Sequence, residues 1–84
     1  MIFRRKARDT VTDEEFEILV QEIAERLKDL IYMNAESQVR ECLTKLRDRI
    51  LTEDPHSEII INVEFTLPFN DLRQIIGRMR RQGV

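Results

Sequence analysis

Residues 58–67, EIIINVEFTL, alternate between apolar and polar side chains more regularly than any other part of the chain. An alternation with a period of two predicts a β-strand with one buried face and one largely solvated face. A single strand leaves the backbone groups of both its edges unpaired, so this strand requires a partner. The choice of that partner constrains the fold most strongly. The predicted buried face consists of Ile59, Ile61, Val63, Phe65 and Leu67.

The partner can come from the N-terminal segment or from a second copy of the chain. Residues 1–9 are predicted to be a basic arm or an edge strand, and they are the only other candidate in this sequence. Pairing between two copies of residues 58–67 would be antiparallel and isologous, because a two-fold axis relates identical strands. We therefore expect a homodimer, with the sheet completed by the N-terminal segment, by the dimer mate, or by both.

A long helix is predicted over residues 12–33. Apolar residues recur there at helical spacing along one stripe, and Thr12 and Glu15 fit a capping box at its start. Acidic side chains fill the first turn, where they interact favourably with the helix dipole. Ile18 and Tyr32 fall outside the apolar stripe, on the back of this helix.

Two further helices follow in the sequence. Residues 35–52 carry a second apolar stripe, and Asn34 can cap it, which would make a helical hairpin. The stripe also continues across the junction with the first helix, so a single kinked rod is the alternative. A short basic helix is predicted over residues 70–81, with Asn70 or Asp71 as its cap. With the strand, these helices predict an α+β fold in one small domain of 84 residues.

The charges are strongly segregated along the chain. All sixteen acidic residues lie within residues 9–71, against six basic ones, so the middle carries −10 and the two ends together carry +8. Two accounts are open: the ends neutralise the middle within the fold or across a dimer, or they form a basic surface for an anionic partner. The residues that would contact phosphate on the second account are Arg4, Arg5, Lys6, Arg8, Arg73, Arg78, Arg80 and Arg81.

The C-terminal stretch contains a known pattern. Residues 74–81, QIIGRMRR, fit Q-x-x-G-R-x-x-R and resemble motif VI of the superfamily 2 helicases. The resemblance implies that two arginines reach the phosphates of a nucleotide, and those positions fall on Arg78 and Arg81. It covers eight residues, and the sequence has no Walker A lysine loop, so nucleotide hydrolysis is not expected. A glycine inside a predicted helix, as at position 77, has two explanations. Another backbone or a phosphate approaches closely there, or the glycine arose by neutral drift that the fold tolerates.

The sequence offers little for catalysis. His56 is the single histidine and stands in a turn beside a proline, while Cys42 lies in an apolar helical stripe. We therefore expect no enzymatic activity, no metal, no cofactor and no small-molecule substrate. No apolar run is long enough to cross a membrane. A single cysteine and the lack of a signal peptide predict a cytoplasmic protein.

Two functions of different classes fit these features. The first is a small, dimeric, non-enzymatic nucleic-acid-binding protein, for example a regulator, that contacts the phosphates of a duplex through its basic termini. No aromatic residue lies among the C-terminal arginines, so backbone contact is expected rather than base stacking. The second is a protein-interaction module, such as a viral or accessory inhibitor or adaptor, that binds a cellular protein through the acidic face of the first helix. Its candidate contacts are Ile18, Glu22, Glu25 and Tyr32.

Overall fold

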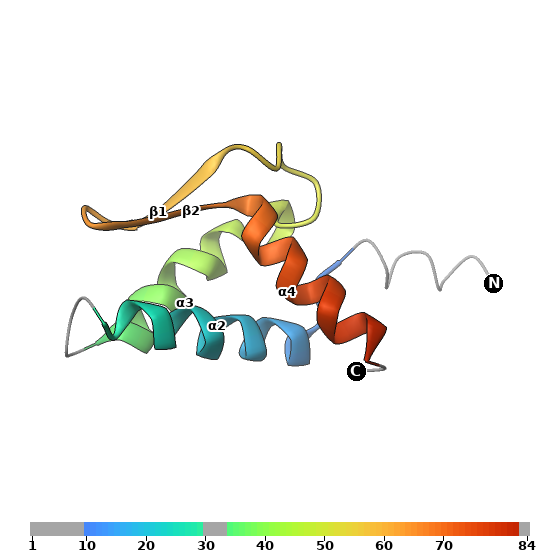
Figure 1. The fold of residues 1–84 in the computed structure, drawn as a ribbon, viewed down its shortest axis with the longest axis horizontal. Helices are drawn as coiled ribbons and strands as arrows, with labels where there is room; N and C mark the ends of the chain where they lie inside the picture. Colours follow the sequence, from blue (N-terminus) through green and yellow to red (C-terminus); the bar gives the residue numbers. More distant parts are fainter. Residues whose placement is uncertain (1–9, 30–33, 83–84) are drawn as a thin grey trace.

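The computed structural model describes residues 10–29 and 34–82, so predictions for residues 1–9, 30–33 and 83–84 lie outside the described part of the chain. Figure 1 shows how the elements are arranged. The elements in chain order are helix α2 (Asp13–Leu27), helix α3 (Ala35–Leu46), the 3-10 helix η1 (Arg47–Arg49), strands β1 (Glu58–Asn62) and β2 (Phe65–Pro68), and helix α4 (Phe69–Arg81). Helices with a small antiparallel sheet make this an α+β structure, as the sequence predicts.

Helix α2 begins where the sequence predicts. The Glu15 N–H donates to Thr12 Oγ1 at 3.1 Å and the Thr12 N–H donates to Glu15 Oε1 at 3.0 Å, so the capping box is formed. The helix ends at Leu27, because the chain then tightens into a turn in which the Asp29 N–H bonds three residues back, at 3.3 Å. The predicted helix over residues 12–33 therefore ends earlier, at Leu27; its predicted residues 30–33 lie outside the described part of the chain.

Asn34 separates helices α2 and α3. Its φ of 65° lies in the left-handed region, which asparagine tolerates better than most residues. The predicted hairpin is thus present, and the continuous rod is wrong. The side chain of Asn34 does not cap α3 as expected; its carbonyl accepts the Gln38 N–H at 2.9 Å. Helix α3 ends at Leu46 rather than at residue 52, because a 3-10 turn follows and carries Ile50 into the core, where it is fully buried.

The prediction of one strand over residues 58–67 is wrong, because this segment folds into a hairpin. Strands β1 and β2 pair antiparallel around a tight turn, with an irregularity in the register just before it. Asn62 stabilises the turn, since its Oδ1 accepts the Glu64 N–H at 2.8 Å. Neither glycine nor proline marks this turn, and the alternation of side chains runs through it, so the sequence pattern concealed it.

The hairpin supplies the strand partner within the chain. Ile59 and Leu67 lie opposite each other and are buried, whereas Ile60 is 68 % exposed and Val63, in the turn, is 95 % exposed. The predicted buried face is thus right for Ile59 and Leu67 and wrong for Val63. One edge of strand β1 is paired with β2, so that edge needs neither the N-terminal segment nor a second subunit. The homodimer therefore stays a prediction that requires another argument.

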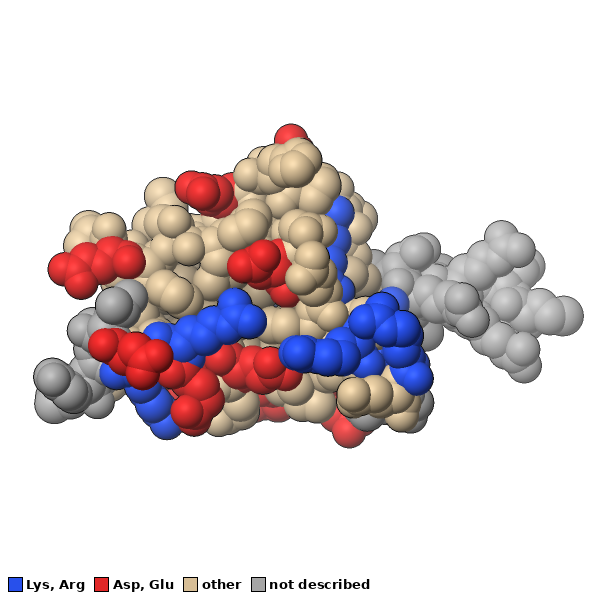
Figure 2. Space-filling view, in the orientation of Figure 1, with Lys and Arg blue, Asp and Glu red and all other residues tan. Residues whose placement is uncertain are grey.

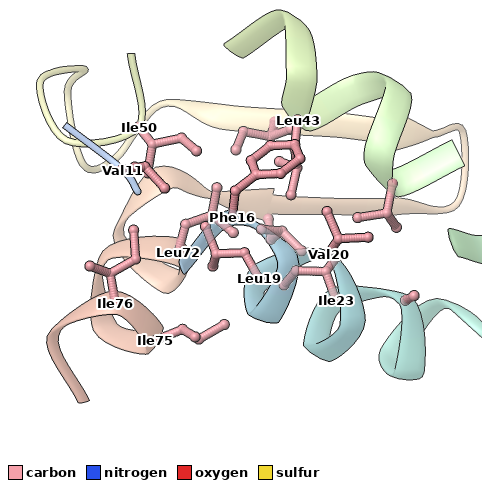
Figure 3. Close-up of a cluster of buried hydrophobic side chains, with 14 of the residues drawn as sticks. Val11, Phe16, Leu19, Val20, Ile23, Leu43, Ile50, Leu72, Ile75 and Ile76 are labelled. Atoms are coloured by element: carbon pink, nitrogen blue, oxygen red, sulfur yellow. The ribbon is translucent and has the colours of Figure 1, made fainter. Parts of the chain in front are cut away.

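The core lies between the helices and the inner face of the hairpin. Figure 3 shows apolar side chains from α2, α3 and α4 converging on one cluster. Fully burying a large aliphatic side chain contributes about 1.5–3 kcal/mol, so this cluster is the main stabilising term of the fold. Its largest fully buried members are Leu19, Ile23, Leu27, Leu43, Ile50, Ile59, Leu72, Ile75 and Ile76.

Candidate anion-binding groove along helix α4

Helix α4 is amphipathic, as the sequence predicts, but it starts differently. Pro68 occupies the N-cap position, and neither Asn70 nor Asp71 caps the helix. The first turn is held by the preceding loop instead, because the Phe69 N–H donates to Ser57 O at 2.9 Å. The apolar side that faces the core consists of Leu72, Ile75, Ile76 and Met79.

Helices α2 and α4 lie antiparallel and are joined by ion pairs. Arg26, late in α2, places Nη1 4.0 Å from Asp71 Oδ2 early in α4. Arg78, late in α4, places Nη2 3.0 Å from Oε1 of Glu22 in the middle of α2. Figure 2 shows basic side chains in a row across this region, interleaved with acidic ones. The basic C-terminal segment is therefore partly neutralised by acidic residues of α2 within the fold, which is one of the two explanations that the sequence left open.

Arg80 fastens the end of α4 to the start of α2. Its Nε donates to Glu15 Oε2 at 2.7 Å, and its Nη2 donates to Glu15 Oε1 at 3.1 Å and to Thr10 O at 3.0 Å. Glu15 is 4 % exposed. The hydrogen bond from Arg80 lowers the pKa of Glu15 despite the opposing effect of burial, and it raises the pKa of Arg80. These bonds orient the guanidinium toward Glu15 and Thr10, so we assign Arg80 a structural role, and its predicted phosphate contact stays a prediction.

Arg73 also holds the fold together. Its Nε donates to Ile50 O at 2.8 Å, and its Nη2 donates to Glu53 O. These carbonyls belong to the loop that follows α3, so Arg73 fixes that loop against α4. Within residues 10–29 and 34–82, no carboxylate forms an ion pair with Arg73. The positive charge of Arg73 is therefore not neutralised by a described carboxylate, and it is held at a fixed position on the surface of α4.

The outward side of α4 forms an open groove of about 560 Å³. Arginines dominate its lining, with a single acidic residue among them and no aromatic side chain. The glutamine, the glycine and both arginines of the Q-x-x-G-R-x-x-R pattern lie along this groove. Its lining residues are Arg26, Asn70, Asp71, Arg73, Gln74, Ile75, Gly77, Arg78 and Arg81.

Arg78 and Arg81 are the accessible cations of the groove. Both residues are exposed. The ion pair of Arg78 with Glu22 is itself open to solvent, with 51 % and 38 % of the two side chains exposed. The side chain of Arg81 forms no hydrogen bond or ion pair with any other residue that the structure describes. These two guanidinium groups can therefore reach a ligand at little cost to the fold.

Gly77 lies within this groove and is not required by the packing. A glycine inside a helix costs about 1 kcal/mol relative to alanine, so it calls for a reason. A Cβ added at Gly77 would meet Nη1 of Arg81 at 3.4 Å, an ordinary contact with the end of a flexible side chain. Alanine would fit here, so close packing within the described fold does not explain the glycine.

Arg26 is the groove residue that the sequence did not single out. It stands in the last turn of α2, where a basic side chain is expected for the helix dipole alone. Its position beside α4 follows from the antiparallel packing of two helices that are more than forty residues apart. No local pattern carries that information.

The four basic residues near the N-terminus, Arg4, Arg5, Lys6 and Arg8, lie outside the described residues. The structure does place their point of attachment, because Thr10 O accepts a hydrogen bond from Arg80 in the last turn of α4. Figure 1 shows the start of α2 and the end of α4 at the same end of the molecule. The two basic ends of the sequence therefore meet the folded body side by side.

Three of the four residues predicted for protein interaction lie on α2 and have partners within the fold. Ile18 is half-buried and packs against the core, Glu22 pairs with Arg78, and Glu25 pairs with Lys28 at 3.2 Å. Tyr32 lies outside the described residues. The apolar part of the predicted acidic face is thus partly used by the fold, while the interaction itself stays a prediction.

The described residues show little further chemistry. No group of three or more His, Cys, Asp or Glu side chains among them is placed to hold a metal ion. Burial raises the pKa of Cys42, and its Sγ contacts Ile60 O at 3.7 Å. No helix within residues 10–29 and 34–82 is long and apolar enough to cross a membrane.

Comparisons of the chain with protein-family models, with curated proteins and with solved structures find no match in any of the three.

Proposed function

We propose that this chain is a small non-enzymatic nucleic-acid-binding protein that contacts the phosphates of a duplex through the groove along α4. The observation that carries the proposal is the gathering of Arg26, Arg73, Arg78 and Arg81 on one open groove that holds a single aspartate. Guanidinium groups bind phosphate oxygens through paired, charge-assisted hydrogen bonds. No aromatic side chain lines the groove, which favours contact with the backbone over stacking on bases.

The ion pairs in the groove do not prevent phosphate binding. Solvent-exposed pairs contribute about 0–1 kcal/mol, so a phosphate can replace Glu22 as the partner of Arg78 with little loss. The Arg26 pair with Asp71 is also exposed and is long, at 4.0 Å. Arg73 acts differently, because its guanidinium is held by backbone carbonyls and contributes its charge from a fixed position.

The N-terminal basic residues would extend this surface. Residues 1–9 precede Thr10, whose carbonyl bonds Arg80 of α4; Arg4, Arg5, Lys6 and Arg8 lie outside the described residues, and we propose that they add to the phosphate contacts. Each phosphate that a protein neutralises releases counterions, so binding through this surface must weaken steeply with salt.

The test compares two double variants in binding to a fluorescent DNA duplex across a salt series. Arg78→Ala/Arg81→Ala removes two groove charges, and Lys45→Ala/Arg49→Ala removes two basic charges outside the groove lining. We expect the groove variant to bind more weakly and to reduce the slope of log affinity against log salt by about 2. The control should bind like the wild-type protein. Equal losses in the two variants would contradict the groove and leave only a general effect of net charge.

A second copy of the chain is the candidate partner of the hairpin. Ile60 is 68 % exposed, and the outer edge of β1 pairs with no strand in the described part of the chain. Because Ile60 O at this edge already contacts Cys42 Sγ of α3 at 3.7 Å, contact between the outer faces of two hairpins, which would cover Ile60 of both copies, suits the dimer better than strand pairing. We propose the homodimer on this ground, with sedimentation over a concentration series as its measurement. Binding of a cellular protein through Glu22 and Glu25 stays the alternative prediction.

A further inference from the structure

The absence of a side chain at Gly77 is the feature of the groove that the fold leaves unexplained. Its backbone lies in a regular stretch of α4, and a Cβ there would make one ordinary contact, with Arg81 Nη1 at 3.4 Å. The fold therefore keeps a less stable residue at a position where alanine fits. A ligand that approaches the helix backbone closely would account for it, since glycine is used where a ligand must come near the main chain.

The charged neighbours of Gly77 surround this bare position. Arg73 and Arg81 stand four residues before and after it, and residues four apart lie next to each other on one face of a helix. Arg78 adjoins it in sequence, and Gln74 stands one turn before it. All four line the same groove as Gly77. The bare stretch of backbone is thus bordered by the accessible guanidinium groups of Arg78 and Arg81 and by the Gln74 amide, which are donors suited to an anion, while Arg73 adds its charge from a fixed position.

We infer that one phosphate of a duplex backbone sits directly against Gly77, between Arg78 and Arg81, so that the glycine is a determinant of binding. This inference rests on the proposed function and adds a specific contact point to it. A methyl group at this position would hold the phosphate away from the helix and lengthen its hydrogen bonds to the surrounding donors, although it removes no charge.

The single variant Gly77→Ala separates binding from folding, because its two expected effects have opposite signs. Alanine is the better helix former, so the midpoint of thermal unfolding should rise by about 4–8 °C. Affinity for a DNA duplex should fall by about tenfold, the loss that accompanies one weakened charge-assisted hydrogen bond. A variant that is more stable and yet binds more weakly cannot owe its weaker binding to unfolding.

A double-mutant cycle tests where the glycine acts. If the phosphate lies against Gly77, then Gly77→Ala weakens binding both in the wild-type protein and in the Arg81→Ala variant. If the glycine only makes room for the side chain of Arg81, then the effect disappears in the Arg81→Ala background, and the inference is wrong.

The outcomes also distinguish the inference from the proposed function. Unchanged affinity of Gly77→Ala, together with a loss in Arg78→Ala/Arg81→Ala, overturns the contact at Gly77 and leaves the groove as the binding surface. Failure of the wild-type protein to bind a duplex at low salt overturns both.

Discussion

The pair formed by Arg80 and Glu15 should be the most stabilising ion pair on the described surface, and Arg80→Met tests this. The variant removes the hydrogen bonds to the Glu15 carboxylate, at 2.7 Å and 3.1 Å, and the one to Thr10 O, at 3.0 Å. Methionine keeps most of the aliphatic stem. Glu15, which is 4 % exposed in the intact fold, would keep the Thr12 N–H as a donor to its carboxylate.

The expected magnitude lies between two limits. Removing one partner of a fully buried pair costs about 3–5 kcal/mol, and removing an exposed pair costs about 0–1 kcal/mol. The Glu15 side chain is buried but that of Arg80 is 32 % exposed, so we expect a loss of about 2–3 kcal/mol in the free energy of unfolding. For a domain of this size the midpoint of thermal unfolding would fall by roughly 10–20 °C.

The assay is urea unfolding followed by circular dichroism, with Arg78→Met as the matched control. That variant makes the same substitution in the same helix but breaks an exposed pair with Glu22, so it should cost under about 1 kcal/mol. Arg80→Met combined with Glu15→Gln should lose less than the sum of the single changes, because the two residues share one interaction. Equal effects of Arg80→Met and Arg78→Met would refute the assignment of Arg80 to the fold.

Acid unfolding and oligomeric state provide two more predictions. The Arg80 hydrogen bond holds the pKa of Glu15 below its usual value of about 4.5, so the stabilisation it gives is present above that pH and is lost as the pH falls through the lower pKa of the folded state. Urea midpoints should therefore drop in acid, with a smaller drop in Arg80→Met; parallel pH profiles of the two proteins would contradict this. Ile60→Glu should shift the proposed dimer to monomer in sedimentation without changing the urea midpoint of the monomer, and a concentration-independent monomer in the wild type would exclude the dimer.

The sequence predicted those features that depend on neighbouring residues. The capping box of Thr12 and Glu15 formed as expected, because both partners lie within one helical turn. The buried side of α4 followed from the spacing of its apolar residues, whereas the sequence left the junction at Asn34 open between a hairpin and a kinked rod. The capping box and the apolar spacing are local signals, so a single sequence is sufficient to read them.

The features that the sequence missed depend on distant contacts or on weak turn signals. The hairpin turn at Asn62 lacks glycine and proline, so the alternation of residues 58–67 was interpreted as one strand. Arg80 was predicted on a phosphate-binding surface, and its partner Glu15 is 65 residues away. Arg26 reaches the groove through helix packing alone. Counting the charges along the sequence was therefore enough to find the basic ends. The three-dimensional contacts were needed to distinguish arginines that hold the fold together from arginines that are accessible to a ligand.

The affinity of the wild-type protein for a DNA duplex, measured across a salt series, tests the central claim most directly. Each neutralised phosphate contributes about −0.9 to the slope of log affinity against log salt. The accessible groove arginines and the N-terminal basic residues together predict a slope of several units, steeper than that of Arg78→Ala/Arg81→Ala by about 2. Absent binding, or an affinity that does not change with salt, would contradict the account.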